Sequence, residues 1–166
     1  MPPLLPDHLK RLRTKRERGL VVLEALTVGL PFCAFKAIAG AALWAGGPAL
    51  RGAAGILLTL SVLDILINGL NVVAVLARGR RWLPVCTLQA VALRVRTSHR
   101  SAELGTALDL MLSFGLVAGM LGLGGLAHLP ADHLQIWNLS VILNVLGAGA
   151  LRFAHAVALP DPRPDP

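Results

Sequence analysis

The sequence predicts an all-α integral membrane protein: a four-transmembrane-helix bundle made of two helical hairpins, with both ends of the chain in the cytoplasm. Three observations predict this fold. The 166 residues are 55% hydrophobic and only 15% charged, whereas soluble domains carry about 25% charged residues. Four apolar stretches of about 25 residues are each long enough to cross the ~30 Å hydrocarbon core of a bilayer. Most Lys and Arg residues fall in two clusters that this arrangement places on one side.

The first hairpin follows a basic segment, 1–18, which is expected to stay in the cytoplasm. The apolar stretch after it is about twice as long as the 7–15-residue core of a signal peptide, so we expect it to remain as a membrane anchor. The first span covers about 19–44 and contains Pro31, which is expected to kink it. A Gly-Gly-Pro turn then leads into the second span, about 52–77.

The second hairpin consists of spans at about 104–128 and 134–158, so that the membrane domain extends over 19–158. The loop between these two spans is short enough for only a tight connection. The Pro-rich tail, 159–166, is predicted to be extended and without regular structure.

The linker between the hairpins, 79–103, is basic and contains an apolar run at 82–93 that is too short to span a bilayer. We interpret this run as an interfacial or re-entrant helix started by Pro84, and both alternatives remain open. A fifth span would instead place the C-terminus outside. The arginines of this linker are expected to contact anionic lipid head groups. They are Arg80, Arg81, Arg94, Arg96 and Arg100.

The formal net charge of +7 is explained by this topology, because cytoplasmic loops of membrane proteins are enriched in Lys and Arg. Nucleic-acid binding is not predicted, since no aromatic or Gly-rich binding motif accompanies the charge. The abundance of Arg, Ala, Leu and Gly is typical of GC-rich bacterial genomes. We therefore expect a multi-pass protein of the bacterial inner membrane.

A polar stripe is predicted along the second span. Ser61, Asp64, Asn68 and Asn71 follow 3-4-3 spacing and therefore share one helix face. Asp64 lies about 20 Å from the inner end of its span, near the bilayer centre, and Lys36 lies about 26 Å from the inner end of the first span, within reach of Asp64. The stripe can line an ion or proton path, or it can be a polar clamp worth about 0.6 kcal/mol per hydrogen bond.

A second charged layer is predicted nearer the cytoplasm. Glu24, Asp109 and Arg152 each lie about 8–9 Å inside their spans, and His155 is one turn from Arg152. We expect Arg152 to bridge the two acids, either as a functional network or as a packing clamp whose charges reach the near interface. The estimated depths of Asp64 and Asp109 differ by about 10 Å, which argues against a hydrolase with two adjacent carboxylates.

Other motifs are few. Gly115-x-x-x-Gly119 lets helix backbones approach closely, and we expect a packing face there, within the bundle or between subunits. The sequence has no nucleotide-binding loop, no G-x-S-x-G, no H-E-x-x-H and no C-x-x-C. No cofactor, metal or catalytic residue is therefore predicted, and the sequence favours a protein that is not an enzyme.

Two classes of function remain open. The chain can be a component of a homo-oligomeric channel or transporter for an ion, a proton or a small solute, with Asp64 as the responsive group. Alternatively, it can be a non-catalytic accessory or scaffold subunit of a larger membrane complex. The expected partners are membrane lipid together with copies of this chain or other membrane subunits.

Overall fold

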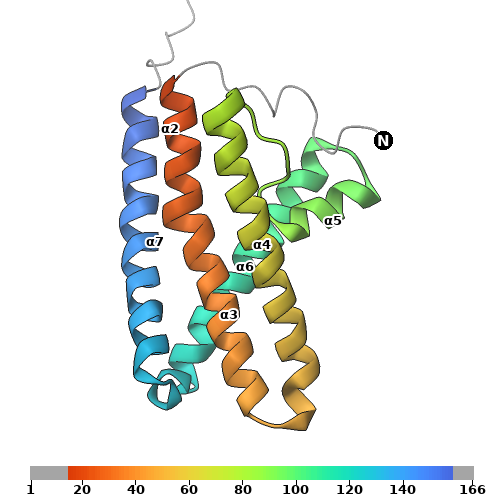
Figure 1. Ribbon diagram of the computed structural model, residues 1–166, viewed down its shortest axis with the longest axis vertical. Coiled ribbons are helices and arrows are strands. Elements are labelled where there is room, and N and C mark those ends of the chain that lie inside the picture. Colours follow the sequence, from red (N-terminus) through yellow and green to blue (C-terminus); the bar gives the residue numbers. More distant parts are fainter. Residues whose placement is uncertain (1–14, 159–166) are drawn as a thin grey trace, which may run out of the picture.

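A computed structural model describes residues 15–158, except for the side chains of residue 16 and of 155–158, and this part of the chain is helical without a β-strand (Figure 1). Four of its helical stretches are long and apolar enough to cross a membrane. They are Glu17–Ala45, Pro48–Arg78, His99–Gly122 and Ala131–Ala154. Most of the predicted basic segment, the predicted tail and the side chain of His155 lie outside the described residues.

The first of these stretches is one rod made of α2 (Lys15–Glu24), the π-helix η1 (Ala25–Gly29) and α3 (Leu30–Ala45). This π-turn directly precedes the start of α3, where Pro31 lies. Proline has no N–H to bond the carbonyl four residues earlier, and its ring crowds that turn. The wider turn directly before it relieves the crowding and keeps the rod continuous.

The second stretch consists of the short 3-10 turn η2 (Pro48–Leu50) and α4 (Arg51–Arg78), which packs along α3. Gly79 ends α4 with φ +66°, and its N–H donates to the Val75 carbonyl at 2.9 Å. Glycine adopts this left-handed conformation without the steric penalty of a Cβ, which makes it a common helix terminator.

The chain then doubles back along α4 before α5 (Thr87–Val95) begins. The backbone N–H of Thr87 donates to the carboxylate of Asp64, which is about 21 Å from the end of α4 at 1.5 Å per residue. The short helix therefore starts beside the middle of α4 and projects sideways from the bundle (Figure 1). Both interpretations of this segment, interfacial and re-entrant, remain predictions.

The third long helix, α6 (His99–Gly122), forms a hairpin with α5 and crosses the bundle obliquely (Figure 1). It begins at His99 and not near 104, because the Ser98 side chain caps it by accepting a hydrogen bond from the Ser101 N–H at 3.1 Å. It ends at Gly122 and not near 128, because Gly124 turns the chain with φ +69° into the 3-10 turn η3 (Gly125–His128).

The last helix, α7 (Ala131–Ala158), packs against η1 and α3. Its buried Trp137 packs at a tilt against Phe35 with ring centroids 4.8 Å apart, in a small apolar core that also contains Phe32 and Ile38. Burial of these aromatic rings fixes α7 on the rod of the first stretch.

The Gly115–Gly119 motif does not pack inside the described part of the bundle. A Cβ placed on either glycine would meet no atom within 4 Å. The close approach expected of this motif therefore remains a prediction for contacts between subunits.

We expect a Gly105→Ala substitution to destabilise the fold by about 1–3 kcal/mol, the usual penalty for overpacking. A Cβ at Gly105 would lie 2.5 Å from the Gln89 Cα and 2.8 Å from the Leu88 carbonyl oxygen, so α5 and α6 would have to separate. The thermal unfolding midpoint of the detergent-solubilised protein measures the effect. Gly115→Ala is the matched control on the same helix, and it is expected to be neutral or slightly stabilising because alanine favours helix. Equal midpoints for the two variants would contradict the close packing of α5 on α6.

Candidate functional site

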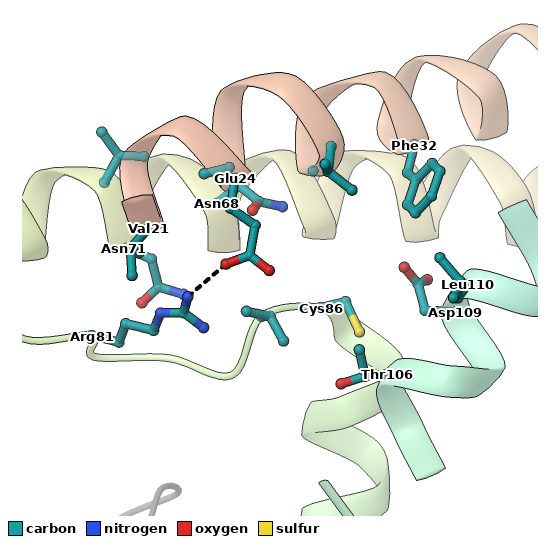
Figure 2. A pocket seen from close by; sticks show the side chains of 15 residues that line it. Val21, Glu24, Phe32, Asn68, Asn71, Arg81, Cys86, Thr106, Asp109 and Leu110 are labelled. Atoms are coloured by element: carbon teal, nitrogen blue, oxygen red, sulfur yellow. Dashed lines mark hydrogen bonds and ion pairs between the residues drawn. The ribbon is translucent and has the colours of Figure 1, made fainter. Parts of the chain in front are cut away.

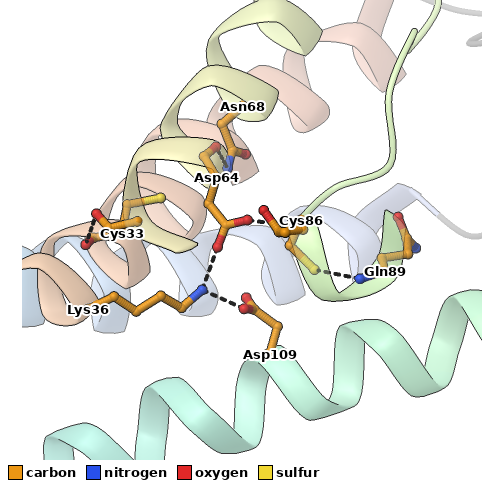
Figure 3. Close-up of polar contacts among 9 residues, drawn as sticks. Cys33, Lys36, Asp64, Asn68, Cys86, Gln89 and Asp109 are labelled. Atoms are coloured by element: carbon orange, nitrogen blue, oxygen red, sulfur yellow. Dashed lines mark hydrogen bonds and ion pairs between the residues drawn. The ribbon is translucent and has the colours of Figure 1, made fainter. Parts of the chain in front are cut away.

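A buried lysine joins three helices at the centre of the molecule. Lys36, on α3, is 0% exposed, and its Nζ donates to Asp64 Oδ2 on α4 at 2.6 Å and to Asp109 Oδ1 on α6 (Figure 3). We call Lys36, Asp64 and Asp109 the charged triad. Neither carboxylate is on the helix that carries the lysine, so the triad exists only when all three helices are assembled.

Both carboxylate oxygens of Asp64 accept hydrogen bonds. Its Oδ2 accepts from Lys36, and its Oδ1 accepts from the backbone N–H of Thr87 at 2.6 Å. Thr87 is the first residue of α5, where unpaired N–H groups and the positive end of the helix dipole favour a negative charge. With only 2% of its surface exposed, Asp64 ties α5 and Lys36 to the middle of α4.

Asp109 is held less completely. Lys36 donates to its Oδ1, whereas its Oδ2 has no hydrogen-bond partner among the described residues. Its side chain is 12% exposed and borders a cavity (Figure 2). One lysine cannot neutralise two carboxylates, so the fully ionised triad carries one net negative charge. Burying an uncompensated charge is costly, and one further positive charge, a proton or a bound cation, would balance the site.

The cavity beside Asp109 has a volume of about 180 Å³ and lies between the rod of α2, η1 and α3, helix α4, the connection to α5, and α6 (Figure 2). Glu24, with half of its side chain exposed, borders the open end, and the nearly buried Asp109 borders the closed end. Between them the walls are mainly apolar, with the polar side chains of Asn68, Asn71 and Thr106 set into them.

An ion pair crosses the open end of this cavity. Arg81 Nη2 donates to Glu24 Oε2 at 2.9 Å and links the connection after α4 to α2. Glu24 is 50% exposed and Arg81 is 21% exposed, and a pair this open to solvent contributes little to stability. The pair therefore contributes little to the stability of the fold, although both of its members border the cavity.

Asn71 holds the doubled-back connection against α4. Its Oδ1 accepts from the backbone N–H groups of Trp82 at 3.1 Å and Leu83 at 2.9 Å. Its Nδ2 donates to the carbonyls of Leu83 at 3.1 Å and Pro84 at 3.0 Å. A single side chain therefore satisfies four backbone groups in a segment that has no regular secondary structure, which buried backbone requires.

Cys86 lies in the same connection and contributes a neutral wall to the cavity. Burial raises the pKa of its thiol to about 12, and the nearby negative charge of Asp109 acts in the same direction. The thiol therefore stays protonated at neutral pH. Asp109 is accordingly the only negatively charged side chain at the closed end of the cavity among the described residues.

The prediction that Arg152 bridges Glu24 and Asp109 is wrong. Glu24 bonds Arg81, and Asp109 bonds Lys36. Arg152 is exposed on α7 and borders a second cavity of about 520 Å³ together with Glu24 and Arg81. The prediction failed because it measured depth from helix ends that were assumed to be level. The doubling back of the chain moves the start of α6 toward the middle of α4, and Asp109 moves with it.

The same displacement overturns the estimate that Asp64 and Asp109 lie at different depths, since both bond one lysine nitrogen. They do not form a pair of catalytic carboxylates, because Lys36 bonds both of them where a shared water or proton would have to sit. The Lys36–Asp64 contact that the sequence allowed is present at 2.6 Å.

The predicted polar stripe is buried along one face of α4. Its members have different partners, however. Ser61 donates to the Cys33 carbonyl at 2.8 Å, and Asn68 donates to the Asp64 carbonyl within its own helix at 2.9 Å. Asn68 and Asn71 border the cavity, whereas Asp64 lies behind it. Asp109, and not Asp64, is therefore the acid of the triad that borders the cavity.

The arginines expected at lipid head groups divide into two sets. Arg81 is bonded to Glu24 at the cavity and is only partly exposed. The others are exposed, as a head-group contact would require. They are Arg80, Arg94, Arg96 and Arg100.

Sequence reasoning missed the start of α5 as part of the site. The signal was present in Cys86-Thr87-Leu88-Gln89, a variant of the capping box. The Cys86 sulfur accepts from the Gln89 N–H at 3.5 Å, and Gln89 Oε1 reaches back to the Val85 N–H at 2.7 Å. Recognition of this cap would have placed a helix N-terminus, and hence an attractive position for a carboxylate, at Thr87.

No protein-family model matches this chain, and no curated protein or solved structure is significantly similar to it.

Proposed function

We propose that this chain is a multi-pass transport protein of the bacterial inner membrane that moves a proton or a small cation through a site at Asp109. The four long apolar helices would span the bilayer with both chain ends in the cytoplasm. Many large apolar side chains on α4, α6 and α7 are exposed, which suits helices in lipid. In this orientation the Glu24–Arg81 end of the cavity faces the cytoplasm, in agreement with the basic connections around it.

One observation carries the proposal: two carboxylates share one buried lysine, and only one of them faces a cavity. Ionisable side chains inside a membrane are costly, and they commonly mark ion pathways and proton relays. A purely structural clamp would be better served by one lysine and one aspartate, which balance each other. The extra carboxylate at the end of a cavity suits a group that is alternately charged and neutralised.

The proposed mechanism assigns different roles to the two acids. Asp64 is bonded to Lys36 and to the backbone N–H at the N-terminus of α5, and it thereby keeps the lysine in place. Asp109 gains a proton or a cation from the cavity, which weakens its attraction to Lys36. Because Asp109 is on α6, this loss of attraction would loosen α6 from α3. The oblique α6, which packs mainly on α5, is the helix best placed to move.

We also propose that the functional unit is a homo-oligomer. Gly115 and Gly119 leave an open strip on α6, and small residues of this kind allow close helix pairing in membranes. Pairing at this strip would place α6 at the contact between two subunits. A movement of α6 would then also act on the neighbouring subunit.

Proteoliposomes test the role of Asp109. With a membrane potential as the driving force, the wild-type chain is expected to carry H⁺ or an alkali cation, and Asp109→Asn is expected to reduce the flux to the level of empty liposomes. The amide keeps the size of the side chain and removes its charge, so the thermal unfolding midpoint should change little. Asp64→Asn should lower both the flux and the midpoint, since it removes the negative charge that bonds the N-terminus of α5 and one of the two carboxylates that bond Lys36.

Glu103→Gln is the matched control, because Glu103 is an exposed carboxylate on the same helix. Its flux should equal that of the wild-type protein. Undiminished flux in Asp109→Asn, with the protein folded, would contradict the proposal.

The alternative function is that of an accessory or scaffold subunit in a larger membrane complex. The same open strip at Gly115 and Gly119 favours it, since a foreign helix can occupy that strip as well as a second copy. In this case the purified wild-type chain would carry no ion in proteoliposomes, and a foreign subunit would be extracted with it in fixed proportion.

A further inference from the structure

We propose that the cavity beside Asp109 binds a small organic cation, an ammonium group attached to an apolar body of about the size of a benzene ring. The proposal rests on the proposed function only in taking this ligand to be the transported cation. The binding site itself is argued from the chemistry of the cavity.

The polar groups that face the cavity are hydrogen-bond acceptors, so a ligand there has to supply a donor. Asp109 Oδ2 has no partner among the described residues, and carboxylates accept strong charge-assisted hydrogen bonds from ammonium groups. Asn68 uses its Nδ2 to bond the Asp64 carbonyl, which leaves its Oδ1 as an acceptor. The charged donors near the cavity, Lys36 and Arg81, are already engaged with carboxylates.

The charges of the lining select a cation over an anion. Glu24 and Arg81 neutralise each other at the open end, and Asp109 contributes a negative charge at the closed end. Lys36 lies behind Asp109 and does not border the cavity. An anion would therefore meet a carboxylate, whereas a cation would complete the charge balance of the triad. A divalent metal is not favoured, because the described residues contain no group of three His, Cys, Asp or Glu side chains that could hold it.

The walls and the volume select an organic cation with an apolar body. Val28, Phe32, Val72, Val85 and Leu110 form most of the surface between the two ends. Ligand sites of this kind are mainly apolar with a few polar groups that fix the orientation. A cavity of about 150 Å³ accommodates benzene, so the 180 Å³ here has room for a ring with an aminomethyl group. The nearby ring of Phe32 can also attract a cation through its face.

Binding of benzylamine to the purified full-length chain in detergent tests the inference. The probe is protonated at neutral pH and matches the cavity in size. We expect it to raise the thermal unfolding midpoint in a saturable manner, because a ligand that binds only the folded state stabilises it. Benzyl alcohol, which has nearly the same shape and no charge, should cause no saturable rise.

Two variants keep the test interpretable. Asp109→Asn should abolish the benzylamine shift. Val72→Phe fills the cavity without touching the triad, so it should also abolish the shift even if Asp109→Asn does not fold. Val73→Phe is its matched control, since Val73 is exposed on the neighbouring position of α4, and it should leave the shift unchanged.

The outcomes separate this inference from the proposed function. A saturable benzylamine shift that is lost in Asp109→Asn and in Val72→Phe supports the site. No shift, an equal shift with benzyl alcohol, or a shift that persists in Val72→Phe overturns it, even if proteoliposomes show Asp109-dependent proton flux. Binding at this site without any flux would instead contradict the transport proposal and retain the site.

Discussion

Replacing Lys36 with methionine is expected to destabilise the protein by about 3–5 kcal/mol, the usual result of removing one partner from a buried ion pair. Lys36 is fully buried and serves both Asp64 and Asp109. Without it, two carboxylates would face each other in an apolar interior with only the Thr87 N–H as a remaining partner. Urea unfolding followed by tryptophan fluorescence in mild detergent measures the change, because Trp137 is buried beside the same helix.

The double variant Lys36→Met/Asp109→Asn separates charge from packing. It removes the excess carboxylate and leaves Asp64 at the N-terminus of α5, so it should recover a large part of the lost stability. Arg51→Met serves as the matched loss of a cation, since Arg51 is exposed at the start of α4, and it should stay within about 0.5 kcal/mol of the wild-type protein. A Lys36→Met protein as stable as the Arg51→Met protein would contradict the charged triad.

Replacing Asn71 with leucine is expected to destabilise the protein by about 2–4 kcal/mol and to release the connection between α4 and α5. The substitution leaves two N–H groups and two carbonyls of 82–84 without their partner. Each net hydrogen bond contributes about 1 kcal/mol, and a buried group left unpaired costs about 1–3 kcal/mol. Hydrogen exchange should therefore accelerate strongly at the amides of Trp82 and Leu83.

Asn138→Leu is the control, because Asn138 is exposed on α7. It should leave exchange in 82–86 unchanged. The Asn71→Leu variant should also affect the site, because the same connection carries Arg81 and Cys86 along the cavity wall. Unaltered exchange at Trp82 and Leu83 would mean that Asn71 does not hold this segment.

Lys36 and Asn71 both depend on the position of the connection between α4 and α5. The triad needs α5 to begin beside Asp64, and α5 can begin there only because the connection doubles back along α4. Asn71 holds that connection at one end, and Asp64 holds it at the other through Thr87. The polar stripe of α4 thus positions the connection between α4 and α5. The cavity that Asp109 borders is the space left open beside this connection.

The sequence by itself determined the four long helices and the face of α4 that is buried. Apolar length predicts helices that can cross a bilayer, and 3-4-3 spacing places Ser61, Asp64, Asn68 and Asn71 on one face whatever the neighbours are. These properties are local, because they depend only on rise and turn per residue. Helix ends were less certain, since a cap such as Ser98 or a glycine such as Gly124 shifts them by a turn or more.

Only the tertiary structure decided which charges meet. Counting residues from helix ends placed Asp109 with Glu24 and Arg152, because it assumed that all helices start at the same level and run parallel. The connection after α4 breaks that assumption by returning about 20 Å along the helix, and α6 then crosses obliquely to bring Asp109 to Lys36. The pairing depends on contacts between segments that are far apart in the chain, and periodicity within one helix carries no information about them.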